Sequence, residues 1–135
     1  MATERSKAVK KLDKIFSEYI RLRKTDDSGY GNCYTCGANH FWKEVDAGHF
    51  MSRACINIRW DPLNVQFQCK RCNGFRGGEQ YLFAQELDNE YGEGTAKSLM
   101  LESRETAKFS ILHIKELIEE YKNKVEEEKR IRGME

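Results

Sequence analysis

The chain contains a single proline and ten glycines among its 135 residues, too few for a collagen-like repeat or a proline-rich disordered segment. No apolar run approaches the roughly 18–20 residues that cross a bilayer. The sequence opens with MATERSKAVKKL, which is charged where a signal peptide would be apolar. These absences predict a soluble, intracellular protein. The length predicts one domain, or one small core with helical extensions, because domains commonly span about 100–150 residues.

The net charge of +1 hides an asymmetry along the chain. Residues 1–24 hold eight Lys or Arg and three Asp or Glu, giving +5, whereas residues 79–135 hold nine and fourteen, giving −5. A basic front and an acidic rear fit a polarised partner such as nucleic acid. Solvated helix faces give similar counts, so charge alone leaves both interpretations open.

Hydrophobic periodicity predicts helices at both ends of the chain. Apolar residues recur at three- and four-residue steps from Thr3 to about Arg23. A helical pattern resumes after Gly78 and stops at Gly92, and a last helix starts near Thr95 or Glu105 and runs to Arg130. The middle section has no helical period, and we expect short strands or loops around residues 41–45 and 47–51. The segment after Val125 has little to bury and is expected to fray.

The last helix carries an apolar stripe at heptad-like spacing. Its members are separated by steps of four and three residues, and they are Ala107, Ile111, Ile114, Ile118, Tyr121 and Val125. The stripe either packs on the N-terminal helix of the same chain or forms the seam of a homodimer.

Four of the five cysteines form two Cys-x2-Cys pairs, Cys33 with Cys36 and Cys69 with Cys72. Two such knuckles place four thiolates around one ion, which is the ligand set of a structural zinc site. Disulfides are rare in intracellular proteins. The spacing therefore predicts one structural Zn²⁺, which would stabilise a section too small for a sufficient hydrophobic core. Cys55 is expected to be a small buried apolar residue.

Between the knuckles lie VDAGHFMSR and RWDPLN, and the second knuckle continues as QCKRCN. Over about residues 30–83, this layout resembles the NinG (Rap) family of lambdoid phages and the zinc-supported HNH (ββα-metal) nucleases. The resemblance implies an α+β fold with a small zinc-stabilised HNH-like core between an N-terminal helix and long C-terminal helices. Its expected parts are residues 1–28, an amphipathic helix; 29–78, the nuclease core; and 79–135, a helical region with the candidate dimerisation seam.

Carried over residue by residue, the resemblance assigns His49 as the general base. It assigns Asn64 as the residue that fixes the loop facing the histidine strand, and Asn73 as a ligand of a catalytic Mg²⁺ or Mn²⁺. Asn73 is also suited to cap the following helix. Arg59 stands where the family carries an arginine suited to a phosphate contact. The basic residues expected to hold the DNA backbone are Arg53, Arg59, Lys70, Arg71 and Arg76.

Gly48 departs from the pattern, because many HNH sites carry a metal-binding acid or histidine directly before the catalytic histidine. Asp46 is the nearest acid, and in a regular strand one two-residue repeat displaces it from position 48 by about 6.6–6.8 Å. A bulge at Ala47-Gly48 would bring Asp46 close enough to bind the ion. Otherwise Asp46 is an acid at the edge of a strand. The aromatic residues Trp60, Phe67 and Phe75 are expected to pack around the zinc core rather than stack on bases.

Two functions from different classes follow. The first is a metal-dependent DNA endonuclease acting on branched or recombination-intermediate DNA, in the cytoplasm of a bacterial host if the chain is of phage origin. The second is a catalytically inactive, zinc-supported DNA-binding or assembly module, which Gly48 favours. The expected partners are branched DNA, recombination proteins and a second copy of the chain through the C-terminal helix, with no membrane.

Overall fold

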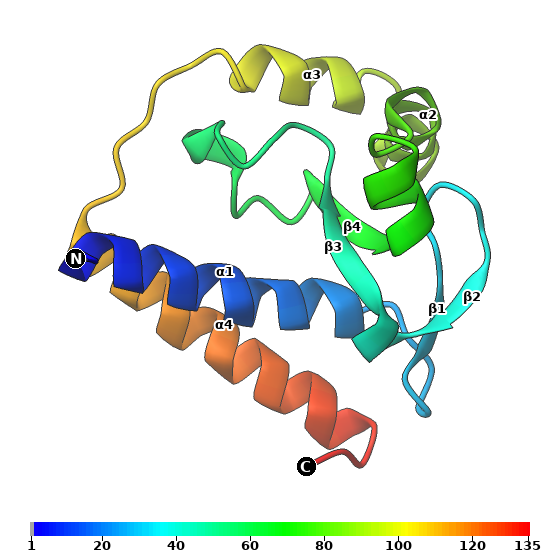
Figure 1. Cartoon of the computed structure of the whole chain (residues 1–135), viewed down its shortest axis with the longest axis horizontal. Helices are drawn as coiled ribbons and strands as arrows, with labels where there is room; N and C mark the ends of the chain where they lie inside the picture. The colour runs from blue at the N-terminus through cyan, green and yellow to red at the C-terminus, as the bar shows by residue number, and fades with distance from the viewer. Residues whose placement is uncertain (1) are drawn as a thin grey trace.

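The computed structural model describes residues 2–135 and shows a mixed α+β protein with two small sheets (Figure 1). The helices are α1 (Glu4–Leu22), α2 (Gln80–Tyr91), α3 (Thr95–Glu102) and α4 (Ile111–Ile131). The strands are β1 (Tyr30–Asn32), β2 (Asn39–Phe41), β3 (Val45–His49) and β4 (Val65–Cys69). Three short helical turns complete the chain: η1 (Trp42–Glu44), η2 (Ile56–Ile58) and the π-helical η3 (Arg71–Phe75). Within residues 2–135, no helix has the length and apolar character needed to span a membrane.

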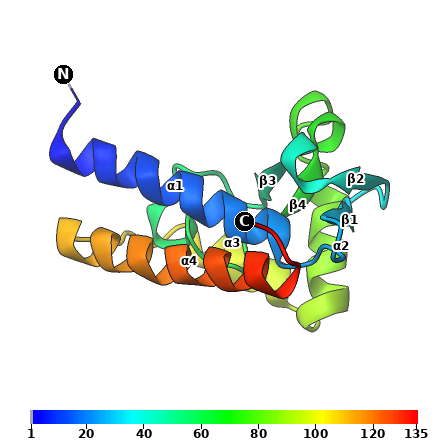
Figure 2. The ribbon, with the colours of Figure 1, turned by 90° about the horizontal axis from the view of Figure 1, so that it is seen from below.

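The two terminal helices lie side by side and run in the same direction (Figures 1 and 2). The ion pairs at the two ends agree with this direction. Lys115 contacts Glu4 at 2.8 Å near the start of both helices, and Lys129 approaches Glu18 at 3.8 Å near their ends. The apolar face of α1 packs against α4 in a core that also takes up residues from the strand region. Its buried members are Ala8, Leu12, Phe16, Ile20, Trp60, Val65, Ile114, Ile118 and Tyr121.

The predicted stripe of the last helix therefore packs on the N-terminal helix of the same chain, which is the first of the two alternatives. Its central residues Ile114, Ile118 and Tyr121 belong to the core shared with α1. A homodimer through α4 would have to use another side of the helix, and it stays a prediction.

Strands β3 and β4 form an antiparallel pair that lies against α1. Their register is regular from Val45 opposite Cys69 to His49 opposite Val65, with every residue between them paired. Strands β1 and β2 form a separate antiparallel pair, and the loop between them carries the first cysteine knuckle. A separate apolar cluster joins the end of β3 to α2 and α3, through Phe50, Phe83, Leu87, Ala96 and Leu99.

Several expected boundaries are wrong. Residues 41–45 are not one strand or loop, because Phe41 ends β2 and residues 42–44 form the turn η1, and β3 begins at Val45 instead of Ala47. The last helical region is two helices, because residues 103–110 leave the helix and Ser110 caps α4 by accepting a hydrogen bond from the N–H of His113. Ala107 consequently lies outside α4.

The end of the chain is ordered, contrary to the expected fraying. Helix α4 continues to Ile131, and the nearly buried side chain of Arg132 donates to the Thr25 hydroxyl at 2.8 Å and to the Thr25 carbonyl at 3.0 Å. Met134 packs against the apolar cluster that contains Leu22 and Trp42. The C-terminus is thus attached to the turn that follows α1.

Candidate functional site

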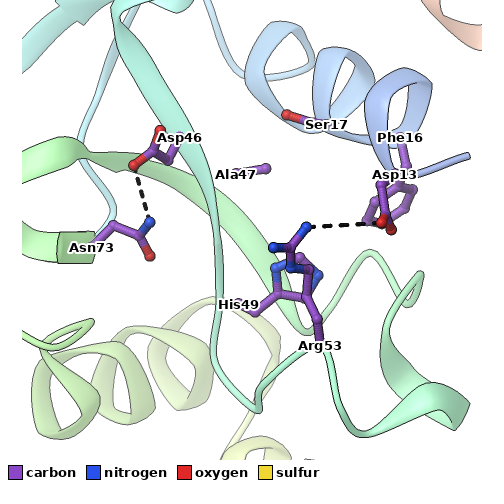
Figure 3. A pocket seen from close by; sticks show the side chains of 8 residues that line it. All are labelled: Asp13, Phe16, Ser17, Asp46, Ala47, His49, Arg53 and Asn73. Atoms are coloured by element: carbon purple, nitrogen blue, oxygen red, sulfur yellow. Dashed lines mark hydrogen bonds and ion pairs between the residues drawn. The ribbon is translucent and has the colours of Figure 1, made fainter. Parts of the chain in front are cut away.

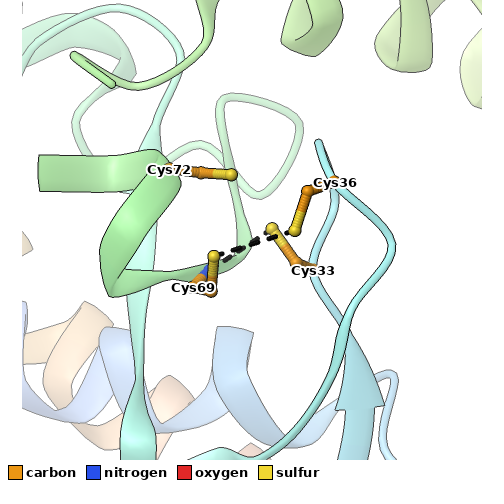
Figure 4. A group of neighbouring side chains, drawn as sticks. All are labelled: Cys33, Cys36, Cys69 and Cys72. Carbon is orange, nitrogen blue, oxygen red and sulfur yellow. Dashed lines mark hydrogen bonds between the residues drawn. The ribbon is translucent and has the colours of Figure 1, made fainter. Parts of the chain in front are cut away.

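The four cysteines of the two knuckles converge from the β1–β2 loop and from the junction of β4 with η3 (Figure 4). All four Sγ atoms lie within 4.8 Å of one another, and Cys36 and Cys69 are 3.8 Å apart. A tetrahedral zinc site with Zn–S bonds of about 2.3 Å separates its sulfurs by about 3.8 Å. The cluster therefore has the ligands and the dimensions to hold a metal such as zinc. Cys55 lies outside it and is partly exposed instead of buried.

The protein environment shifts the pKa values of these thiols in different directions. Burial raises the pKa of Cys36, and it raises that of Cys72 to about 12. Burial also acts on Cys33, but the Cys69 N–H at 3.4 Å and the Thr35 hydroxyl at 3.5 Å stabilise its thiolate and bring its pKa to about 6. Four adjacent thiolates need a cation to coexist, so folding of this section and metal binding are coupled.

A pocket of about 470 Å³ lies between α1, strand β3 and η3 (Figure 3). It brings together the sequence-predicted residues His49, Asp46, Asn73 and Arg53. Helix α1 adds Asp13, Phe16 and Ser17, and Ala47 completes the wall. In Figure 3, Asp46 and Asn73 lie on one side of β3, whereas His49, Arg53 and Asp13 lie on the other.

His49 is held in one tautomer by the backbone. Its Nε2 is 2.9 Å from the Arg59 carbonyl oxygen, which can only accept, so Nε2 carries the proton and Nδ1 is the basic nitrogen of the neutral ring. Burial lowers the pKa of His49; the Arg59 carbonyl opposes this shift, and the charge of Arg53 reinforces it. The imidazole is therefore neutral at pH 7 and able to accept a proton.

Asp13 is the site residue that sequence reasoning missed. Its Oδ1 accepts hydrogen bonds from Arg59 Nε at 3.0 Å and from Trp60 Nε1 at 2.9 Å. Asp13 thus anchors the side chain of the residue whose carbonyl holds His49. The available signal was one of three acids on a lysine-rich helix, but nothing in the sequence pairs it with residues 59 and 60, more than forty positions away.

Asp46 and Asn73 form a second group in the pocket. Asn73 Nδ2 donates to Asp46 Oδ2 at 3.0 Å, and Lys70 Nζ donates to Asp46 Oδ1 at 2.7 Å. The expected bulge at Ala47-Gly48 is absent, because the β3–β4 register is regular there. Asp46 instead reaches Asn73 because η3 folds back beside the start of β3.

Gly48 has no space for a side chain. A Cβ atom built there would lie 2.1 Å from Gln68 Oε1 and 2.9 Å from Gln68 Cβ. The Gln68 side chain is buried and is held by its Nε2, which donates to the Gly78 carbonyl at 2.8 Å and to the Thr35 hydroxyl at 3.1 Å. Gln68 therefore closes the position that is acidic in many HNH sites, and any acidic ligand must come from elsewhere.

Of the remaining predicted residues, some are buried and structural and one lies on the surface. Asn64 is fully buried, and its side chain bonds the Met51 N–H and carbonyl and the Ile58 carbonyl, so it holds the loop after β3. Trp60 and Phe67 are buried, but they pack in the clusters formed with the terminal helices instead of around the cysteines. Phe75 is not buried, since its side chain is 96% exposed.

The basic residues expected to bind DNA differ in how far their side chains are exposed. Arg53 and Lys70 have side chains 62% and 67% exposed, and Arg71 and Arg76 are also exposed. Arg59 is mostly buried against Asp13. The first four can contact a polyanion directly, whereas Arg59 is occupied by an intramolecular partner.

The fold and the site define a small α+β protein with a four-cysteine cluster that could hold a metal, and with a polar pocket that contains one neutral histidine. The family model described as bacteriophage lambda NinG protein matches residues 1–131, and the chain belongs to this family. No curated protein and no solved structure gives a match to the chain.

Proposed function

We propose that this protein is a divalent-metal-dependent DNA endonuclease of the HNH (ββα-metal) type. The observation that carries the proposal is the pocket that gathers His49, in a fixed tautomer, with the Asp46–Asn73 pair. The elements β3, β4 and η3 follow one another as strand, strand and helical turn, which is the order of a ββα-metal unit. The four-cysteine centre lies at the junction of β4 and η3, so a bound zinc would fix Asn73 relative to β3.

His49 is suited to act as the general base. Its Nδ1 would take a proton from a water molecule as the water oxygen forms a bond to phosphorus, and the bond from phosphorus to the leaving oxygen would break. The Arg59 carbonyl supports this role, because its hydrogen bond to Nε2–H becomes stronger when the ring gains a positive charge.

Asp46 and Asn73 are the residues that would hold Mg²⁺ or Mn²⁺. A carboxylate and a side-chain amide oxygen are hard oxygen donors, and one or two protein ligands leave the waters that these ions retain. When bound, such an ion would stabilise negative charge on the phosphate and the leaving oxygen. Lys70 forms an ion pair with Asp46. Because the Lys70 side chain is largely exposed, this ion pair is weak enough to open.

The basic side chains around the pocket would hold the phosphate backbone. Arg53 lines the pocket and Lys70 contacts its Asp46, while Arg71 and Arg76 are exposed on the adjoining η3 turn. These contacts carry no sequence information, which fits a nuclease that recognises DNA structure. Membership of the NinG family supports branched DNA as the substrate class and phage recombination, in the bacterial cytoplasm, as the process.

The second candidate is a zinc-supported DNA-binding or assembly module without cleavage activity. Closure of position 48 by Gln68 favours it, because the acid that many HNH sites use cannot be accommodated. The two candidates differ in whether DNA is cut, and they agree on zinc and on DNA binding.

The deciding experiment uses the full, zinc-loaded chain with a four-way junction, a flap and a linear duplex. Each DNA is incubated with Mg²⁺, with Mn²⁺ and with no added divalent ion, since a chelator would also remove zinc. We expect strand cleavage that requires the added ion and falls at least about 100-fold in His49→Ala, the scale of a lost general base. His113→Ala, on the exposed start of α4, is the matched control and should cleave normally.

Asp46→Asn should also lower cleavage, and a higher Mn²⁺ concentration should partly restore it if Asp46 holds the ion. Binding of DNA without cleavage by any of these proteins would replace the endonuclease with the inactive module. Equal cleavage by the wild type and His49→Ala would remove His49 from the reaction.

A further inference from the structure

Phe75 is the most exposed large apolar side chain within residues 2–135, at 96%. It lies at the end of η3 and forgoes the free energy that burial of the ring would have gained. Single exposed apolar residues are common and need no explanation by themselves. The surroundings of this ring, however, supply two independent observations.

The first observation is the charge around the ring. Lys70, Arg71 and Arg76 lie within five positions of Phe75, and no acidic residue occurs between Asp61 and Glu79. Arg71 forms no ion pair with any residue of the described chain, and Arg76 reaches Glu79 only at 3.9 Å. An exposed ring among cations is suited to a partner that is both anionic and aromatic.

The second observation is that the ring is held firmly and left clear on both sides. The turn is attached at both ends, because Cys72 belongs to the cysteine cluster and the Gly78 N–H donates to the Cys72 carbonyl at 2.8 Å. A Cβ atom added at Gly74 or at Gly77 would meet no atom within 4 Å. Gly74 has an ordinary φ, so the backbone does not require glycine there. The missing side chains leave both approaches to the ring open.

The position of the ring relates it to the pocket. Phe75 follows Asn73 by two residues, a chain separation of at most about 7 Å, and Asn73 lines the pocket with His49. Phe75 does not itself line the pocket, so a nucleobase stacked on it would belong to a nucleotide that neighbours the one whose phosphate enters the pocket.

We propose that Phe75 is a stacking platform for an unpaired or unstacked nucleobase of a DNA strand whose backbone passes the pocket. Aromatic rings stack on bases without regard to sequence, and flanking cations track the backbone. An intact duplex offers no free base face except at its ends, whereas a branch point does. The inference deepens the proposed function and rests on it, since it makes Phe75 the residue that selects branched over linear DNA.

Binding is measured separately from cleavage, with the zinc-loaded His49→Ala protein and no added Mg²⁺ or Mn²⁺. The probes are a four-way junction and a linear duplex of the same sequence. Phe75→Ala should weaken junction binding roughly 5- to 150-fold, the range found for loss of one stacked base, and leave duplex binding unchanged. Phe75→Trp should retain the preference. Leu112→Ala, which removes a 68% exposed side chain from α4, is the matched control and should change neither affinity.

A second readout locates the contact. Light-induced crosslinking from 5-iodouracil placed at the branch point should label residue 75, and the same base placed in the duplex arms should not. All variants should keep the melting temperature of the parent, because Phe75 is exposed.

The outcomes separate the inference from the proposed function. If Phe75→Ala keeps the preference for the junction, or weakens both DNAs equally, the stacking platform is wrong even where Mg²⁺-dependent cleavage is found. Binding of both DNAs with one affinity by the parent protein overturns it as well. If Phe75-dependent junction binding is found and the wild type cuts no DNA, the platform stands and the endonuclease proposal fails.

Discussion

At the scale of single residues, the chemistry of His49 depends on contacts from elsewhere in the chain. The Arg59 carbonyl fixes its tautomer, and Asp13, on α1, fixes the side chain of Arg59. Burial by the surrounding elements keeps the ring neutral by lowering its pKa. The neutral ring is therefore held in a fixed tautomer with Nδ1 as its basic nitrogen.

The lowered pKa of His49 gives a prediction for stability as a function of pH. The unfolded chain takes up a proton at about pH 6.5, whereas the folded chain does so only at a lower pH. Stability from this group is therefore fully present above about pH 6.5 and is lost as the pH falls through the folded pKa. We expect the melting temperature of the wild type to fall more steeply between about pH 7 and pH 5 than that of His49→Gln.

The difference between the two proteins isolates the histidine, because the zinc ligands and other titrating groups are common to both. Parallel pH profiles would show that His49 has the same pKa in the folded and unfolded chains. In the cleavage assay, the wild-type rate should rise with pH and level off below the usual histidine range, as expected for a base of lowered pKa.

The sequence indicated which residues line the pocket more successfully than which contacts those residues make. The motif order indicated His49, Asn73 and the cysteines, since their spacing reflects local geometry. It could not indicate Asp13, which reaches the site through the packing of α1, nor that Gln68 occupies the space beside Gly48. It also placed Phe75 in the core, because an aromatic residue in a short motif gives no information on which way a π-helical turn directs it.

At the scale of elements, the cysteine cluster joins segments that have little else to hold them. Strands β1 and β2 are three residues long, and η3 is a single turn. A two-stranded pair of this size is marginal in water. A metal bound by the cluster would therefore help to hold η3, and with it Asn73, in place.

We expect Cys69→Ser to abolish metal binding and to unfold the section from β1 to η3. A structural zinc contributes about 10–16 kcal/mol of apparent binding free energy, which is comparable to the whole stability of a small domain. Cys55→Ser is the matched control, because Cys55 lies outside the cluster. Zinc content should fall from one ion per chain to none in Cys69→Ser only. Amide exchange in β3 and β4 should become fast in the same variant.

Equal zinc content and equal melting temperatures in the wild type, Cys69→Ser and Cys55→Ser would contradict a structural role for the cluster. His49→Ala should keep both the metal and the fold, which separates loss of chemistry from loss of structure.

The helices were easier to predict than the strands, for a physical reason. The α1 pattern repeats over nineteen residues and ends within about one residue of its predicted bounds. The strands are three to five residues long, too short for an alternating pattern to stand out, so the sequence did not distinguish strand from loop around the turn η1. The break between α3 and α4 was missed because the apolar stripe continues in sequence through Ala107, although the chain leaves the helix there.

At the scale of the whole molecule, the two terminal helices close the structure around the pocket. Helix α1 supplies Asp13 to the pocket on one side and packs on α4 with the other. The ordered C-terminus adds the contact between Arg132 and Thr25, which ties α4 to the turn leading to β1. Stability of the α1–α4 pair should therefore be needed for the geometry of the site.

The packing of α4 on α1 within one chain can be tested against a dimer seam by a pair of substitutions on the same helix. Ile114 is fully buried and Leu112 is 68% exposed. Ile114→Ala should lower the free energy of unfolding by about 2–5 kcal/mol, whereas Leu112→Ala should change it by less than about 0.5 kcal/mol. Urea unfolding of both variants measures these values.

An intrachain core predicts that the melting temperature of the wild type does not depend on protein concentration, since no second chain enters the folding equilibrium. A stripe that formed a dimer seam would instead give a melting temperature that rises with concentration, and Ile114→Ala would reduce the sedimenting mass. A homodimer assembled on junction DNA by another side of α4 remains compatible with the intrachain core. Sedimentation with and without the junction distinguishes that case, because the mass per DNA would then correspond to two chains while the free protein remains a monomer.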